Sequence, residues 1–225
     1  METTELIIAA LGLAWASGLN LYAGLATLGI LAATGQMNLP PDLEILGQPA
    51  VIAASVFMYC VEFVADKVPG VDTTWDTIQT FIRIPAGAVL ALGAVGELDP
   101  AIQVAALIIG GSVAATSHAF KAGSRVLINT SPEPFSNWGA SLVEDALVIG
   151  GVTLAVLQPL TFAVLIVVFF AVAIWLMPKI WRGIKTLWNR LRILFGGDRG
   201  NSIDHAPLTV SLKPTPGHNE PRSLS

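Results

Sequence analysis

The chain of 225 residues is 53% hydrophobic and only 12% charged, with a formal net charge of −4 and a mean hydropathy of +0.67. A soluble domain has about 25% charged residues, so this composition excludes an ordinary soluble domain and indicates a multi-pass membrane protein. The formal charge by itself says nothing about nucleic acid, but no basic patch rich in aromatic residues appears outside the C-terminal segment, so we expect no nucleic-acid partner. The single cysteine, Cys60, excludes an intramolecular disulfide.

Six hydrophobic segments are expected to cross the membrane, which predicts an all-α integral membrane protein. About 20 apolar residues span a bilayer. On that basis the segments cover 5–35, 49–67, 73–96, 101–122, 135–157 and 160–177. The first segment is long and is interrupted by Ser-Gly-Leu-Asn at 17–20. Two alternatives stay open for it: a long tilted helix, or a helix that unwinds near Gly18.

The C-terminal part divides into a basic stretch and a polar tail, which follow a transmembrane domain over 1–178. Residues 179–196 alternate cations with tryptophans, as is typical of an amphipathic helix at a membrane interface. We expect anionic lipids to bind this stretch. Residues 197–225 are polar and proline-rich, which predicts a disordered cytoplasmic tail. The cations of the basic stretch are Lys179, Arg182, Lys185, Arg190 and Arg192.

The distribution of lysine and arginine predicts the orientation in the membrane. Lys67, Lys121 and Arg125 lie at or near the ends of the second and fourth segments, and the basic stretch follows the sixth. The loops after the first, third and fifth segments contain neither lysine nor arginine. The positive-inside rule then places both termini in the cytoplasm, with six spans between them.

An internal repeat is one alternative for the architecture. Residues 16–24 resemble residues 116–123, and residues 61–63 resemble residues 143–145, in the same order in each half. Three spans per half would make two inverted three-helix halves, as in many secondary transporters. Chance similarity between helices rich in small residues is the other alternative.

Charged residues inside the membrane segments are the main candidates for a functional site, since each costs roughly 2.5–3.5 kcal/mol at a helix centre. A turn at 69–70 (Pro-Gly) joins the second and third segments into a hairpin. Two alternatives stay open for its charges: a structural ion pair that locks the hairpin, or a proton or anion site. Helical spacing places Tyr59, Glu62 and Asp66 on one face of the first helix and Asp76, Gln79 and Arg83 on one face of the second.

A second group of charges lies about ten residues into the fifth segment, at Glu144 and Asp145. Two adjacent carboxylates at that depth cannot both face lipid, so at least one needs a proton or a cationic partner. Lys121 and Arg125 share a helix face with His118 and are the candidate partners. The predicted binding residues are Glu62, Asp66, Asp76, Arg83, Glu144, Asp145, Lys121, Arg125 and Asn20.

Motifs for catalysis are absent from the sequence. It contains no G-x-S-x-G, Walker or G-x-G-x-x-G pattern and no H-x-x-x-H or E-x-x-H spacing, so we expect neither an enzyme nor a bound metal or cofactor. One hypothesis is a small secondary transporter, or a lipid-carrier flippase, that uses intramembrane carboxylates on a small-molecule or lipid substrate. The alternative is a non-catalytic membrane organiser that binds a partner. Homo-oligomerisation stays open under both hypotheses.

The hairpin sequence resembles a known family. The run EFVADKVPGVD at 62–72, followed by Trp-Asp at 75–76 and TFIR at 80–83, is similar to bacterial membrane proteins grouped as domain of unknown function 4126. The run GLNLY at 18–22 also fits this family. The resemblance covers about 10–178 and leaves out the basic stretch and the tail. It implies a multi-pass protein of the bacterial inner membrane and carries no known activity.

Overall fold

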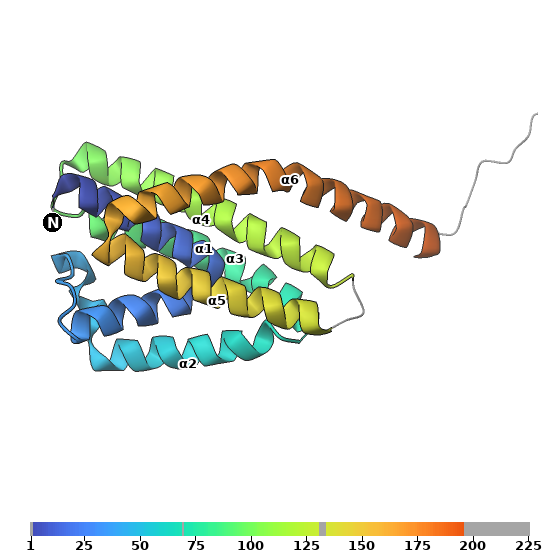
Figure 1. Cartoon of the computed structure of the whole chain (residues 1–225), viewed down its shortest axis with the longest axis horizontal. Coiled ribbons are helices and arrows are strands. Elements are labelled where there is room, and N and C mark those ends of the chain that lie inside the picture. Colours follow the sequence, from blue (N-terminus) through green and yellow to red (C-terminus); the bar gives the residue numbers. More distant parts are fainter. Residues whose placement is uncertain (1, 69, 131–133, 196–225) are drawn as a thin grey trace, which may run out of the picture. The chain divides into compact units, whose positions relative to one another are not determined.

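Figure 1 shows a computed structural model of the chain, which describes residues 2–68, 70–130 and 134–195. The described residues form helices and no strand. The chain divides into two compact units, Met1–Leu187 and Trp188–Ser225. The predicted disordered tail at 197–225 lies outside the described residues. The helices are α1 (Thr3–Ala33), the 3-10 helix η1 (Pro41–Gly47), α2 (Pro49–Ala65), α3 (Val71–Ala94), α4 (Pro100–Ile128), α5 (Pro134–Leu157) and α6 (Pro159–Phe195).

Helix α1 folds back on itself at Asn20. This residue has extended backbone angles (φ −148°, ψ 94°), and its side-chain oxygen accepts the backbone N–H of Ala23 at 2.9 Å, which caps the returning arm. In a straight helix, Leu6 and Leu28 would lie about 33 Å apart. Instead they line one small cavity together with Ala94. The interrupted segment is therefore a re-entrant hairpin of two helical arms, with both its ends at one end of the bundle (Figure 1).

The re-entrant hairpin changes the expected topology. By length and composition five helices can span a membrane, and η1 with α2, bent by 68°, makes a sixth candidate. Because α1 returns to its own end, α2 to α6 are the helices that run from one end of the bundle to the other (Figure 1). The start of α1 lies beside the α5–α6 turn, where Glu5 and Gln158 line one cavity. At the other end, Gly183 of α6 packs against Leu127 of α4. The location of both termini in the cytoplasm stays a prediction, because the residues after 195 lie outside the described part of the chain.

Two further sequence expectations differ from the structure. Helix α6 continues through Pro178, where the sequence predicted the start of a separate interfacial helix. The loss of one N–H at a proline weakens a helix locally without ending it when both flanking segments favour helix. The proposed repeat partners also differ, because residues 16–24 contain the break at Asn20 whereas residues 116–123 lie in the uninterrupted α4.

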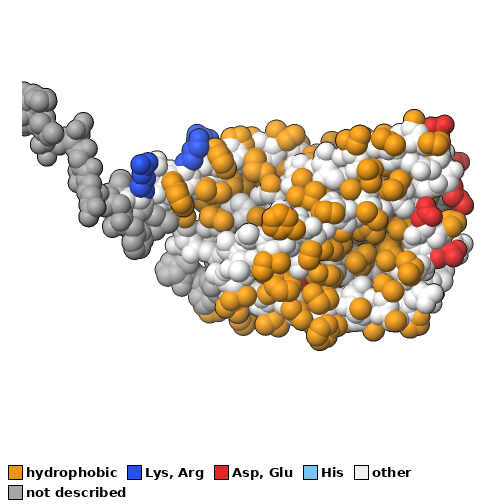
Figure 2. All heavy atoms as spheres, turned by 180° about the vertical axis from the view of Figure 1, so that it is seen from behind, with side chains coloured by type: hydrophobic (Ala, Val, Ile, Leu, Met, Phe, Trp, Pro, Cys, Tyr) orange, Lys and Arg blue, Asp and Glu red, His pale blue; other side chains and the backbone are white. Residues whose placement is uncertain are grey.

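The surface matches a protein surrounded by lipid. Figure 2 shows apolar side chains spread over one face of the molecule and acidic side chains gathered at one end. Large apolar side chains are exposed on several crossing helices, with Phe57 at 66%, Phe81 at 80% and Val167 at 67%. Soluble proteins rarely expose contiguous apolar surface on this scale, so the belt is explained by contact with acyl chains.

The first arm of α1 packs between α3 and α4. Gly18 lies against backbone atoms of Ala114 and His118, so the two helices approach closely. The hydroxyl of Ser17 donates to the carbonyl oxygen of Arg83 at 2.6 Å, and the hydroxyl of Ser117 donates to the carbonyl oxygen of Trp15 at 3.1 Å. These contacts hold the tip of the hairpin at the level of the charged side chains of α3 and α4.

Candidate functional site

Charged side chains from α2, α3, α4 and α5 meet in one buried group, which we call the ionic cluster. Its cations are almost completely buried, with Arg83 and Arg125 at 0% exposure and Lys121 at 1%. Glu144 is the most exposed member, with 13% of its side chain accessible. The cluster contains eight of the nine residues predicted from the sequence, and the ninth, Asn20, touches it from α1. Its members are Glu62, Asp66, Asp76, Arg83, Lys121, Arg125, Glu144 and Asp145.

Arg83 joins α2 to α3. Its guanidinium forms an ion pair with Glu62 through Nη2 and a second with Asp76 through Nη1, at 3.1 Å. An ion pair across the hairpin, which was one of the two alternatives for these charges, is therefore present. The ring of His118 continues this contact, with Nδ1 at 3.3 Å from Nη1 of Arg83 and Nε2 at 2.7 Å from the hydroxyl of Thr80.

Lys121 is the centre of the cluster. Its ammonium nitrogen lies 2.9 Å from Asp66 and 3.2 Å from Glu62, the two carboxylates of α2 and its C-terminal turn. It also lies 3.5 Å from Glu144 on α5 and 3.8 Å from Asp76 on α3. The two glutamates that the sequence analysis placed in separate halves therefore share one cation.

Arg125 joins α4 to α5 near the ends of both helices. Its Nη2 lies 2.7 Å from Glu144 and 3.5 Å from Asp66. Its Nη1 donates to the side-chain oxygen of Asn137 at 2.6 Å and to the backbone oxygens of Asn137 and Asp66. An arginine held by this many acceptors has little freedom to move, so Arg125 fixes the geometry at this end of the cluster.

Asp145 lies on the side of the cluster that faces α1. Its Oδ1 accepts the side-chain amide of Asn20 at 3.0 Å. The nearby Lys67, in the turn after α2, donates instead to the carbonyl oxygen of Phe63 at 3.1 Å and to the hydroxyl of Ser141 at 3.3 Å. Burial lowers the pKa of Lys67 from its ordinary value, an effect that the charges of Asp145 and Asp66 oppose.

A polar contact between two turns supports the cluster and was missed by the sequence analysis. Asp72, at the start of α3, accepts the backbone N–H groups of Gly70 and Thr73 at 2.9 and 2.6 Å. Both of its oxygens also accept the amide of Asn129 at 2.8 Å, which ties the α2–α3 turn to the end of α4. A carboxylate in one turn and an amide in another were visible in the sequence, but their proximity depends on the packing of α3 on α4.

The cluster has more negative than positive charge. Five carboxylates face three cations, so the formal charge is −2 when all eight groups are ionised. Several buried oxygens also have no hydrogen-bond partner among the described residues: Glu62 Oε2, Asp66 Oδ1, Asp76 Oδ2, Gln79 Oε1 and Asp145 Oδ2. In the described part of the chain no group of His, Cys, Asp and Glu is arranged to hold a metal ion.

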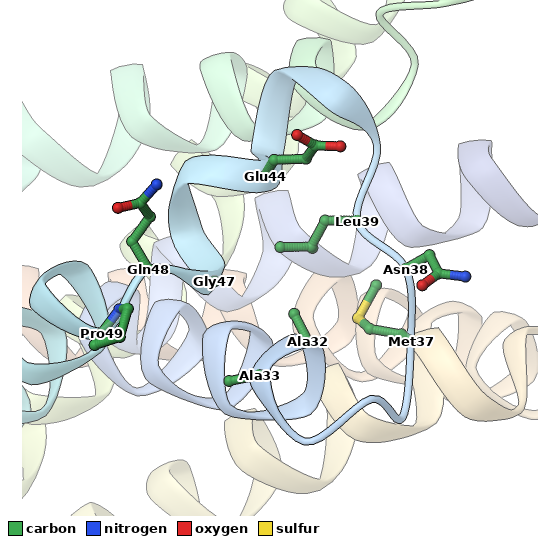
Figure 3. A pocket seen from close by; sticks show the side chains of 9 residues that line it. All are labelled: Ala32, Ala33, Met37, Asn38, Leu39, Glu44, Gly47, Gln48 and Pro49. Carbon is green, nitrogen blue, oxygen red and sulfur yellow. The ribbon is translucent and has the colours of Figure 1, made fainter.

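Five cavities of the structure lie away from the ionic cluster, because no residue of the cluster lines any of them. The one in Figure 3, of about 540 Å³, is formed by the end of α1, by η1 and by the start of α2, with Asn38, Glu44 and Gln48 among its polar side chains. Another, of about 450 Å³, is an apolar groove between α5 and α6. The burial of its members shows that the ionic cluster is nearly enclosed by protein in this conformation, with Glu144 as its most exposed member.

The fold and the cluster define an all-helical multi-pass membrane protein with buried charges between its helices. The chain belongs to the family described as Domain of unknown function (DUF4126), whose model matches residues 7–179. The match includes every residue of the ionic cluster and ends where the basic stretch begins. No curated protein and no solved structure matches the chain.

Proposed function

We propose that this protein is a secondary transporter whose coupling cation binds at the ionic cluster. The supporting observation is that five carboxylates, four of them buried and Glu144 at 13% exposure, face only three buried cations. Uncompensated charge away from water costs several kcal/mol per group. A network that served only to hold helices together is better stabilised by equal numbers of opposite charges. The excess of two negative charges instead suits a site that takes up positive charge.

The re-entrant hairpin supports the same proposal. Broken helices at membrane depth occur where their freed backbone is buried in protein or lines a cavity, and transporters use them to form substrate and ion sites. The break of α1 falls at Asn20, the residue that contacts Asp145. The enclosed cluster then corresponds to an occluded state, which alternating access requires between its two open states.

Two other functions are each favoured by one observation. The enclosure of the ionic cluster favours a membrane organiser without transport activity. The apolar groove between α5 and α6 favours a lipid-carrier flippase, because its lining suits an acyl or polyprenyl chain. The groove is lined by Trp15, Gly151 and Phe162, and it reaches Ala146, the residue after Asp145. Neither observation accounts for the excess of carboxylates, and we therefore place transport of a cation-coupled solute first. None of these functions is enzymatic.

Transport is tested with purified protein in liposomes that enclose a pH-sensitive dye. Inward and outward gradients of sodium, potassium or ammonium are applied, and we expect at least one to change the internal pH through the wild-type protein. Glu62→Gln should abolish this signal because an amide binds no proton and balances no cation, whereas Glu97→Gln, an exposed acid outside the cluster, should match the wild type. A folded wild-type protein that moves none of these ions contradicts the proposal, and movement of fluorescent lipid between leaflets in the same liposomes favours the flippase.

The topology of five crossings predicts that the chain ends lie on opposite sides of a bacterial inner membrane. Lys67, Arg125 and the basic residues of α6 before 188 mark one end of the crossing helices, which the positive-inside rule places in the cytoplasm. Reporters fused at the N-terminus and after Gln158 should both report the outer side, and a reporter after Arg192 the cytoplasm. A cytoplasmic N-terminus would mean that α1 crosses the membrane.

We propose further that the basic residues of α6 contact anionic headgroups, at about 1 kcal/mol each.

A further inference from the structure

We propose that Asp145 is the group that binds and releases a proton in the ionic cluster, and that Asn20 at the tip of α1 positions it. This assignment rests on the proposed transport function and names its coupling ion. The observation that supports the assignment is that the contacts of Asp145 differ from those of the other four carboxylates of the ionic cluster.

Asp145 is the carboxylate of the cluster that forms no ion pair with any residue in the described part of the chain. Each of the other four lies within 4.0 Å of Arg83, Lys121 or Arg125, whereas the ion pairs among the described residues do not include Asp145. Its side chain is nevertheless buried, with 5% exposure, and its Oδ2 has no hydrogen-bond partner in the described structure. A buried carboxylate without a cation is costly, and a proton on it removes that cost.

The cations nearest to Asp145 are occupied elsewhere. Lys121 is shared by four other carboxylates, and Lys67 donates to a backbone carbonyl and to Ser141. When the site opens to water, Asp145 therefore gains an O–H bond by taking a proton from a hydronium ion, which leaves as water, and it becomes a carboxylate again when it returns that proton to water on the other side. The titratable and charged groups that act on it are Asp66, Lys67 and Lys121, together with Tyr59 of α2, whose side chain interacts with Asp145 through a hydrogen bond; Glu144 precedes it on α5.

Asn20 links the charge of Asp145 to the hairpin of α1. The side-chain oxygen of Asn20 is held by the backbone N–H of Ala23, so its amide group must face outward and donate to Asp145. An ionised carboxylate accepts this hydrogen bond more strongly than a neutral acid does. Loss of the charge on Asp145 therefore weakens the attachment of the hairpin tip to α5. Proton binding and movement of the hairpin are coupled through this contact, which is what proton-driven alternating access needs.

The test is infrared titration of the full-length protein in lipid nanodiscs, reading the carbonyl band of protonated carboxyl groups. We expect the wild type to lose such a band as the pH is raised, Asp145→Asn to lack that band, and Asp42→Asn, which changes an exposed aspartate of η1, to retain it. Asn20→Ser keeps a residue that caps helices well but removes the amide donor to Asp145. The midpoint of the band should then move up by about one pH unit, because the donor that favours the ionised form is gone.

Each outcome decides between the alternatives. A wild type without a titrating carboxyl band, or an Asp145→Asn protein that keeps it, overturns the assignment. If Asp145→Asn does not fold, an unchanged midpoint in Asn20→Ser overturns it instead. The liposome assay separates this inference from the proposed function: a titrating band without ion transport refutes the transporter, and ion transport without the band refutes Asp145 as the proton carrier.

Discussion

Arg83→Ala is expected to lower the free energy of unfolding by about 3–5 kcal/mol, the range found when one partner of a buried ion pair is removed. Arg83 is 0% exposed and is the shared partner of Glu62 and Asp76. Without it, five carboxylates face only two cations, and Glu62 and Asp76 depend on Lys121 alone. The expected result is a large loss of folded protein rather than a small change in activity.

The measurement is the unfolding midpoint of purified protein in detergent, followed by loss of helical signal or of monodisperse protein on heating. Arg182→Ala removes an exposed arginine from α6 and should leave the midpoint near that of the wild type. The double variant Arg83→Ala with Glu62→Gln should recover part of the loss, because it no longer strands the charge of Glu62. Equal midpoints for Arg83→Ala and Arg182→Ala would mean that the ionic cluster does not stabilise the fold.

The composition of the ionic cluster could be predicted because charges stand out in an apolar chain. Each charged residue in a membrane segment needs a partner or a proton, and helical spacing then assigns it to a face. This reasoning found Arg83 opposite Glu62, and Lys121 and Arg125 opposite Glu144. The roles of these residues as binding residues stay a prediction. The family membership was also predicted from the hairpin sequence and is confirmed.

The re-entrant hairpin could not be decided from the sequence, because a long apolar segment with Ser, Gly and Asn fits both a tilted helix and a folded one. The decision depends on contacts between distant segments: Ser17 binds the backbone of α3, Ser117 binds the backbone of α1, and Asn20 binds Asp145. Such partners satisfy the polar groups freed at the break. The predicted location of the N-terminus depends on the same undecided point and stays a prediction.

Gly18→Ala is expected to destabilise the fold by about 1–3 kcal/mol through overpacking. A Cβ at this position would overlap the side-chain oxygen of Ser117 and the carbonyl oxygen of Ala114, and would lie 2.9 Å from the backbone nitrogen of His118. Two of these three atoms belong to the backbone of α4, so the clash cannot be relieved by rotating a side chain. The first arm of α1 must move away from α4, which also displaces Asn20 from Asp145.

Gly150→Ala provides the matched control, since a Cβ at Gly150 of α5 has nothing within 4 Å and alanine favours helix over glycine by roughly 1 kcal/mol. The two substitutions make the same chemical change in two helices, so their unfolding midpoints should move in opposite directions. Gly18→Ala should in addition shift the infrared titration of Asp145, because the hairpin tip carries the amide that donates to it. A Gly18→Ala protein as stable as Gly150→Ala would mean that α1 and α4 are not in close contact, and the re-entrant hairpin would lose the packing that holds its tip beside the ionic cluster.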